Sequence, residues 1–165
     1  MKKIKHYIKE LLFIIITVTI LTNLLSLYKS KTLTHTPLTI HSIHLIDNSL
    51  YMIKSNKPIL IHFWATWCPV CKVEASNIAF LSKYFEVLTV VVKSGDDTKV
   101  RKFLQEHHYN FKVVNDKNGV LASAFKIAGF PTTFIYNKEH KLAFSDVGYS
   151  STLTLYLKML WAQKE

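Results

Sequence analysis

Hydrophobic and polar positions follow several patterns along this chain, and each pattern predicts one kind of element. Residues 1–10 are basic, and an uncharged apolar run follows at 11–28. A run of this length is enough for a helix to cross a bilayer. Polar residues at 29–37 include a proline at the end and are typical of a tether. Strand and helix patterns then alternate through 38–165, where we expect one globular domain.

Strands are predicted in this domain where apolar residues alternate with polar ones or form short continuous runs. Alternation predicts a strand at 38–46, and 51–54 is a second short strand or a turn. The remaining strands are predicted at 59–64, 87–92, 111–114, 132–136 and 141–147. The runs at 59–64 and 87–92 are typical of buried central strands, and the last two strands face each other as a hairpin.

Helices are predicted where apolar residues recur at helical spacing. These segments are 69–84, 96–107, 118–127 and 151–163. In the last helix we expect the inner face to consist of Leu153, Leu157, Leu160 and Trp161. Strand–helix alternation that ends in a hairpin and a helix indicates an α/β fold, in which helices sandwich a mixed central sheet.

The apolar segment 11–28 has three interpretations. A buried core helix is disfavoured because the segment has no polar face. A cleaved signal peptide usually has a shorter apolar region and a small-residue cleavage site, and 24–31 offers no convincing site. We favour an uncleaved single-pass transmembrane anchor in the cytoplasmic membrane. Because lysines beside a membrane span tend to stay in the cytoplasm, we expect 1–10 inside and the domain outside, in the periplasm of a Gram-negative cell.

Composition narrows the function classes. The chain has 165 residues, of which 49% are hydrophobic and 13% aromatic, and this excludes a disordered protein. A net charge of +10 raises nucleic-acid binding as an option, but the lysines are scattered and Arg101 is the only arginine, so we expect no nucleic-acid partner. The sequence contains no nucleotide or flavin motif, and we expect no organic cofactor.

The two cysteines of the chain form a C-x-x-C motif at the start of a predicted helix. Cys68 follows the buried strand 59–64, and Pro69 suits the first helical turn, where a missing N–H costs nothing. Two cysteines at this spacing can close a disulfide within one turn. The helix dipole favours the thiolate of the first cysteine. We expect an exposed Cys68 to attack a substrate disulfide and Cys71 to resolve the mixed disulfide.

Metal binding is the alternative for a C-x-x-C motif. Half of a zinc site is disfavoured because there is no second C-x-x-C and no H-x-x-x-H pair nearby. His35, His41 and His44 suggest copper, but His41 and His44 point to opposite sides of a strand, which favours surface polar residues. We assign no metal. A copper-binding module that uses the two cysteines remains an alternative function.

A resemblance to a known family rests on three stretches: F-W-A-T-W-C-P-V-C at 63–71, G-F-P-T at 129–132, and the closing hairpin and helix. From Ile59 to its end, the chain resembles thioredoxin-fold proteins. F-W-A-T-W-C, the apolar N-terminal segment and the extra strand and helix at 111–127 are similar to one subgroup. This subgroup comprises the membrane-anchored extracytoplasmic thiol-disulfide oxidoreductases of the TlpA/ResA/DsbE type.

The resemblance implies how the substrate is bound. Pro131 is expected to be cis and to face the disulfide. This leaves the backbone of Phe130, with Thr132 beside it, to pair with an extended substrate peptide. Trp67 is expected to cover the disulfide and to contact substrate, whereas Trp64 is expected in the core.

The resemblance also suggests two residues that move protons. Glu74, three residues after Cys71, matches a carboxylate often present in the subgroup, and it is either a proton-transfer group or a surface charge. Thioredoxins carry a buried acid six residues before the attacking cysteine, whereas this chain has His62 there. His62 is either a proton-transfer group near neutral pH or a hydrogen-bonded core histidine.

A reductase of protein disulfides is the function that the resemblance implies. It would receive electrons from a membrane thiol donor, and apocytochrome c before haem attachment is one substrate of this kind. The same fold also serves disulfide oxidants and isomerases, because direction depends on relative reduction potentials. Pro69 and Val70 replace the Gly-Pro of thioredoxin between the cysteines, and motif spacing alone does not give the potential.

Overall fold

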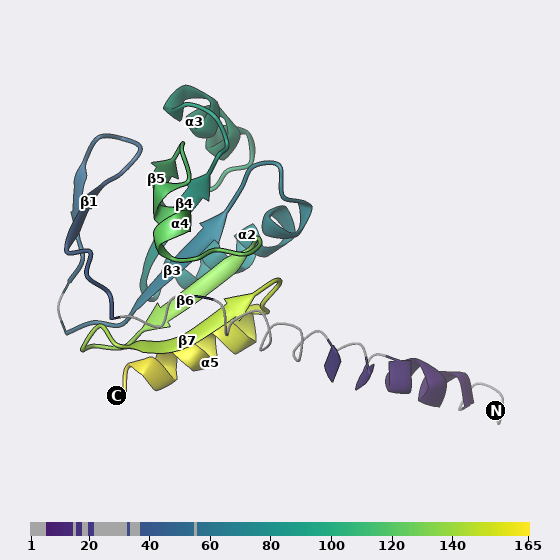
Figure 1. Ribbon diagram of the computed structural model, residues 1–165. Coiled ribbons are helices and arrows are strands. Elements are labelled where there is room, and N and C mark those ends of the chain that lie inside the picture. Colours follow the sequence, from purple (N-terminus) through teal and green to yellow (C-terminus); the bar gives the residue numbers. More distant parts are fainter. Residues whose placement is uncertain (1–5, 15, 18–19, 22–32, 34–36, 55) are drawn as a thin grey trace.

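The computed structural model describes residues 6–14, 16–17, 20–21, 33, 37–54 and 56–165. A mixed five-stranded sheet forms the centre of the domain, in the order β5–β4–β3–β6–β7 (Figure 1). Its strands are β3 (Ile59–Trp64), β4 (Glu86–Val92), β5 (Lys112–Asp116), β6 (Thr132–Tyr136) and β7 (Leu142–Val147). The first three are parallel, β6 is antiparallel to β3, and β7 is antiparallel to β6. The predicted mixed α/β sheet is confirmed.

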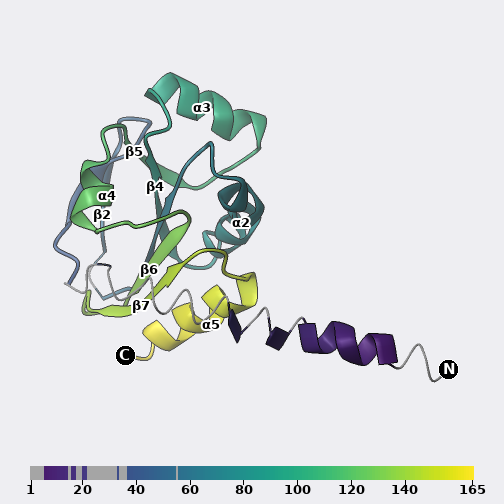
Figure 2. The same ribbon diagram turned by 45° about the vertical axis from the view of Figure 1, so that its right-hand side comes forward.

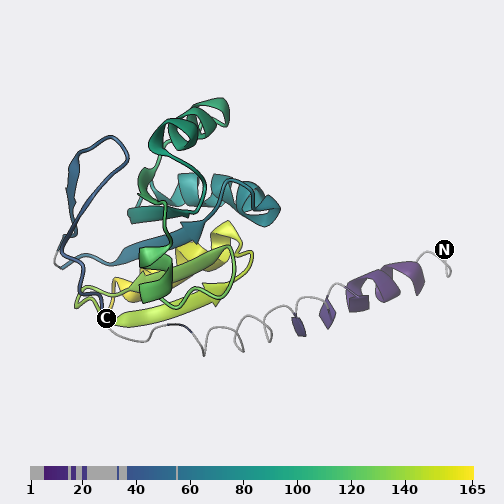
Figure 3. The same ribbon diagram turned by 45° about the horizontal axis from the view of Figure 1, so that its top comes forward.

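Helices cover both faces of this sheet. They are α2 (Pro69–Leu81), α3 (Asp97–Glu106), α4 (Val120–Ala124) and α5 (Thr152–Ala162). Figure 2 shows α2 on one side of the sheet and α4 on the other, and Figure 3 shows α4 in front of the strands with α5 behind them. The predicted helix 118–127 is reduced to α4, which begins after Gly119 in a left-handed conformation (φ 77°). Only a residue without a Cβ adopts this conformation readily.

Strand β3 lies at the centre of the core. All six of its residues are buried, and alternate side chains enter opposite layers. Ile59, Ile61 and Phe63 pack in the layer that contains α4, whereas Leu60 packs in the layer that contains α5. The strand therefore has a fixed position, and the chain that leaves its carboxyl end leads directly to Cys68.

A small hairpin lies apart from the main sheet (Figure 1). It pairs β1 (Ser42–His44) with β2 (Leu50–Met52). The strand predicted at 38–46 is therefore too long. Its two ends bond to the main domain instead: Leu38 N donates to His140 O at 3.0 Å, and Ile46 N donates to Val113 O at 2.8 Å.

The inner face predicted for α5 is wrong. The side chains buried against the sheet are Leu155, Met159 and Ala162, whereas Leu153, Leu157 and Leu160 lie on the opposite side. Trp161 lies at the flank of the helix, half exposed, with its ring edge-on against Phe144 of β7. The helix carries apolar residues on both of these stripes, so helical spacing alone does not choose between them. The stripe that ends in the small residue Ala162 is the one that packs on the sheet.

Most of the predicted anchor 11–28 and most of the predicted tether 29–37 lie outside the described residues. Residues 6–14 are helical. Within the part of the chain that the structure describes, no helix combines the length and the apolar character needed to cross a membrane. Leu33 is buried in the core layer of α4, although the sequence places it in the tether. The packed domain therefore includes a residue before 38.

Candidate redox-active site

A disulfide joins Cys68 and Cys71 at the first turn of α2, with a Cα–Cα distance of 5.3 Å. Cys68 is the N-cap of the helix, and its Sγ accepts a hydrogen bond from Cys71 N at 3.1 Å. Pro69 occupies the first helical position, as predicted. The sulfur of Cys68 therefore lies among the free amides at the positive end of the helix dipole, where negative charge is stabilised.

Both cysteines are buried, so the prediction that Cys68 is exposed is wrong for the disulfide form. The exposed fraction is 4% for Cys68 and 2% for Cys71. The neighbours of Cys68 supply the exposed surface instead: Trp67, Pro69 and Val70 all face solvent. A substrate therefore meets these side chains before it reaches the sulfur atoms.

A groove of about 480 Å³ leads to the disulfide. Its lining residues are Trp67, Cys68, Pro69, Val70, Ile127, Ala128, Gly129 and Phe130. Cys68 lines this groove and Cys71 does not, which fits Cys68 as the cysteine that a substrate reaches first. No lining residue carries a charge, so the groove suits apolar segments.

The second wall of the groove comes from the loop before β6. The Phe130–Pro131 peptide bond is cis, as predicted, and Phe130 packs edge-on against Trp67 with ring centroids 5.6 Å apart. Thr132 does not reach the groove: it is fully buried, and its hydroxyl donates to Gly129 O at 2.8 Å. Its position in β6, between β3 and β7, explains this burial. The Thr132 side chain therefore shapes the loop and is not exposed in the groove.

The two tryptophans beside the motif differ as predicted. Trp64 is buried and packs against Phe103 and Phe111. Trp67 is exposed, and its indole Nε1 donates to Lys93 O at 3.3 Å. This bond fixes the indole ring beside the groove.

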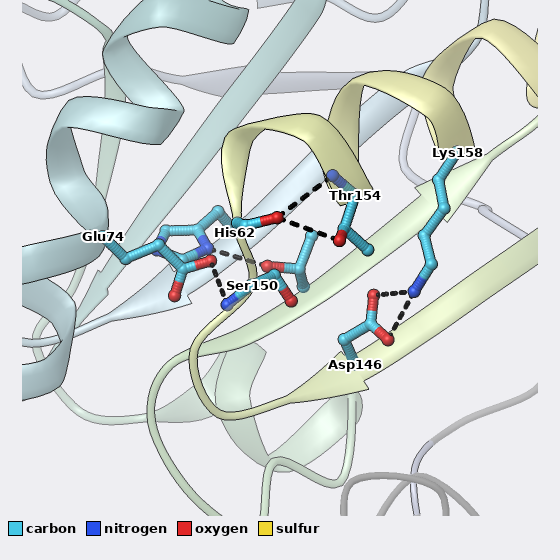
Figure 4. Close-up of polar contacts among 8 residues, drawn as sticks. His62, Glu74, Asp146, Ser150, Thr154 and Lys158 are labelled. Carbon is cyan, nitrogen blue, oxygen red and sulfur yellow. Dashed lines mark hydrogen bonds and ion pairs between the residues drawn. The ribbon is translucent and has the colours of Figure 1, made fainter. Parts of the chain in front are cut away.

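Glu74 is fully buried and is not a surface charge. Its Oε1 accepts a hydrogen bond from Ser150 N at 3.3 Å, while Oε2 has no partner among the described residues. Burial, with a smaller contribution from Asp146, raises the pKa of Glu74 to about 8, although the Ser150 bond opposes this. The residue lies one turn after Cys71 on the same face of α2, and Figure 4 shows it beside Ser150. A buried carboxyl group therefore stands beside the inner cysteine.

His62 is a hydrogen-bonded core residue. It is buried in β3, and its Nδ1 lies 2.9 Å from Thr133 Oγ1 on the neighbouring strand (Figure 4). Burial lowers the pKa of His62 to about 3. The imidazole is therefore neutral at physiological pH, which favours the core interpretation over proton transfer.

Residues that the sequence does not reveal complete the site. Ser150 holds Glu74, and Asp146 contributes negative charge near it while forming an ion pair with Lys158 at 2.6 Å (Figure 4). These residues are far from the motif in sequence and are of common types, so no pattern indicates them. The sequence does offer an indication for Ile127 and Ala128, which line the groove, because they directly precede the G-F-P-T motif.

The copper interpretation gains no support from the histidines. His41 and His44 are exposed on or beside β1, and His35 lies outside the described residues. Among the residues that are described, no cluster of three or more His, Cys, Asp or Glu side chains has the arrangement of a metal site.

The sheet order, the helix-capping disulfide and the cis proline together define a class, the thioredoxin-like thiol-disulfide oxidoreductases. Residues 38–145 match the AhpC/TSA family, and the chain belongs to this family. A thioredoxin-like protein of Haemophilus influenzae is 30% identical over 167 residues, which cover 98% of each chain.

Two further comparisons agree. The thiol-disulfide oxidoreductase ResA of Bacillus subtilis is 34% identical over 90 residues, which cover 52% of this chain and 50% of ResA. The chain thus matches about half the length of that relative. The crystal structure of StoA from Bacillus subtilis superposes with a TM-score of 0.66 at 21% identity, covering 76% of this chain and 98% of StoA, and it shows the shared fold. The protein is an enzyme of thiol-disulfide exchange.

Proposed function

We propose that this enzyme is a membrane-tethered, extracytoplasmic reductase of protein disulfides. The observation that carries the exchange chemistry of this proposal is the position of Cys68. Its sulfur accepts an amide hydrogen bond at the N-terminus of α2, and it is the cysteine that lines the groove. This is the arrangement that an attacking thiolate requires.

The reaction begins with the reduced pair. The Cys68 thiolate attacks one sulfur of the substrate disulfide, so that a new S–S bond forms, the substrate S–S bond breaks, and the other substrate sulfur leaves as a thiolate that takes a proton. The Cys71 thiolate then attacks Cys68 Sγ and releases the second substrate thiol. Two electrons pass to the substrate, and the product is the Cys68–Cys71 disulfide present in this structure.

Glu74 is proposed to accept the proton of Cys71. The inner cysteine is buried, so its thiol has little access to water. The carboxyl group of Glu74 lies one turn away, and its pKa of about 8 is close to that of a thiol. When the pKa values of the donor and the acceptor are similar, a proton passes between them near neutral pH at little cost in free energy.

Substrate recognition is proposed to involve the groove. Trp67 and Phe130 form an aromatic corner beside Cys68, and the backbone at Phe130 is placed to pair with an extended peptide. Pro131 and Pro69 support the two walls by fixing the backbone on either side.

The proposed membrane tether rests on the N-terminal sequence, and the proposed electron donor follows from the compartment in which the tether places the domain. The apolar run 11–28 is proposed as an anchor, with 1–10 in the cytoplasm and the domain outside. Extracytoplasmic compartments oxidise thiols, so a reductase there needs a supply of electrons. A thiol carrier in the same membrane is the proposed donor, and apocytochrome c is one proposed substrate. An oxidant or isomerase is the second candidate, because the site geometry is the same for both directions.

The order of attack is tested by trapping. In Cys71→Ser, Cys68 still attacks but nothing resolves the mixed disulfide, so we expect substrate adducts on non-reducing gels of cells. The chain has no third cysteine, and every adduct is therefore formed through Cys68. The matched control Cys68→Ser is expected to trap few adducts. Adducts in Cys68→Ser but not in Cys71→Ser would reverse the assigned roles, and adducts in neither variant would contradict exchange by this pair.

A further inference from the structure

An exposed apolar surface lies away from the active site and has no role in the chemistry described above. The outer side of α5 presents Leu153, Leu157 and Leu160, with exposed fractions of 67%, 55% and 36%. Trp161 borders them with 47% of its surface exposed, while one edge of its ring packs against Phe144 of β7. Phe80 in the last turn of α2 and Tyr84, three residues past its end, are also exposed, and their ring centroids lie 5.0 Å apart. Tyr84 contacts Tyr156 of α5, so the two groups are continuous. We call these six exposed residues the apolar face.

This surface is unusual for a helix that packs on a sheet. The inner side of α5 is already buried against the sheet through Leu155, Met159 and Ala162, so the fold does not need the outer leucines. A packed surface helix normally has a polar outer side, and a helix that is apolar all round is normally covered on both sides. An exposed apolar patch of this kind marks a binding surface.

Lysines border the apolar face at the C-terminal end of α5. Lys57, Lys83 and Lys138 line one hollow together with Tyr84 and Gln163, and Lys164 follows Gln163. Among the described residues, no ion pair includes Lys57, Lys83 or Lys164; Lys138 stands beside Glu139, which pairs with Lys141. Glu86 lines the same hollow, but its negative charge is neutralised by ion pairs with Lys54 and Lys112. The border is therefore positive.

The N-terminal sequence brings the domain close to a membrane. Leu33 is fixed in the core layer of α4, on the face of the sheet opposite α5, and the five residue steps from Tyr28, the end of the apolar run, to Leu33 span at most about 18 Å. Leu38 is bonded to His140 in the turn that also contains Lys138. The chain thus passes the lysine border of the apolar face as it enters the domain.

We propose that the apolar face docks on the anionic lipid bilayer in which the chain is anchored. Leucines, aromatic rings and flanking lysines are the composition of surfaces that lie in a membrane interface, and the lysines match anionic headgroups. The inference rests on the proposed anchor. Cys68 lies at the N-terminal end of α2, whereas Phe80 and Tyr84 lie at its other end. Docking therefore leaves the groove open while it fixes the orientation of the domain.

Tryptophan quenching tests this contact. The full chain is placed in nanodiscs of phosphatidylethanolamine and phosphatidylglycerol, with or without brominated acyl chains that quench nearby indole rings. We expect brominated lipid to reduce the Trp161 emission, obtained as the difference between wild type and Trp161→Phe, by about half, because an interfacial ring lies at the acyl boundary. Leu157→Lys should abolish the quenching, and because the Leu157 side chain is half exposed we expect this variant to fold.

A matched control separates the outcomes. Val120→Lys changes an equally exposed residue on α4, on the other side of the sheet, and should leave the quenching unchanged. Chains that stay with the nanodiscs but show no quenching of Trp161 would overturn docking and leave the anchor intact. Chains that do not stay with the nanodiscs would overturn both proposals. A dimer that Leu157→Lys dissociates, without quenching, would assign the face to a second copy instead.

Discussion

At the scale of single residues, the site joins two environments that lie six residues apart along α2, at Cys68 and at Glu74. Cys68 Sγ lies at the helix N-terminus and accepts an amide bond, whereas Glu74 is buried with one carboxylate oxygen unpaired. The first environment stabilises a thiolate, and the second favours a protonated carboxyl group. The enzyme thus stabilises a negative charge at the cysteine that lines the groove. Beside its inner cysteine it holds a carboxyl group that is mostly protonated at pH 7 and accepts a proton only in its deprotonated form.

The motif predicts part of this arrangement. C-x-x-C after a buried strand indicates the Cys68–Cys71 disulfide, and the G-F-P-T resemblance indicates the cis bond at Pro131. The burial of Cys68 and of Thr132 is not predictable from the motif, because it depends on side chains brought in by other elements. The same holds for Glu74, whose hydrogen-bond partner among the described residues is Ser150, 76 positions away in the sequence.

The buried carboxyl group predicts a pH dependence of stability. The pKa of Glu74 is about 8 in the folded protein against an ordinary value of 4.5, so the folded state holds a proton that the unfolded state releases above pH 4.5. Stability of the oxidised wild type should fall as the pH rises from about 5 to 8. The Glu74→Gln variant has no such loss. At pH 9 its free energy of unfolding should therefore exceed that of the wild type by on the order of 3 kcal/mol.

Urea unfolding at pH 5 and pH 9 measures this difference. Glu106→Gln is the matched control, because Glu106 is exposed and pairs only with exposed Lys102 across one helical turn. It should change stability by no more than about 0.5 kcal/mol at either pH. A Glu74→Gln advantage that does not grow between the two pH values would contradict a protonated carboxyl group in the folded protein.

At the scale of elements, the sequence predicts central elements better than peripheral ones. The bounds of β3 are as predicted. Its continuous apolar run must be buried on both faces, and only the centre of the sheet, between the two layers of helices, provides this. The hairpin strand is shorter than predicted, because backbone bonds to the main domain replace local pairing at its ends. Helix α4 is shorter because Gly119 before it and Lys126 after it both have positive φ. The orientation of α5 depends on tertiary packing, since both of its stripes are apolar.

Two alanine substitutions test which side of α5 faces the sheet. Met159 is fully buried and Leu157 is half exposed. Met159→Ala should lower the free energy of unfolding by about 2–5 kcal/mol, because it leaves a cavity, whereas Leu157→Ala should cost no more than about 1 kcal/mol. Urea denaturation of the full chain in detergent gives both values. The reverse order would mean that α5 packs through its other stripe.

At the scale of the whole molecule, the groove and the apolar face occupy different parts of the surface. The groove lies between the start of α2 and the loop before β6, and the apolar face lies on the outer side of α5 and the end of α2. A domain tethered by its N-terminus and docked through α5 would present its cysteines to substrates along the membrane. Such a position also suits electron transfer from a donor within the same membrane.

The single-domain organisation is predictable from the length and from the strand and helix patterns. The boundary at its start is not, because Leu33 is an isolated apolar residue in a polar stretch, and only the folded core shows where it packs. The direction of electron flow is also not readable from the sequence, since it depends on a difference of reduction potentials between proteins.

The redox state of Cys68 and Cys71 in growing cells tests the central claim most directly. Cells are quenched with acid, free thiols are alkylated with a mass tag, and the tagged and untagged chains are separated by size. An extracytoplasmic compartment oxidises unprotected thiols, so a pair that is mainly reduced requires a supply of electrons. The account predicts a mainly reduced pair that becomes oxidised when the membrane thiol donor is removed. A pair that is mainly oxidised whether or not this donor is present would contradict the reductase function.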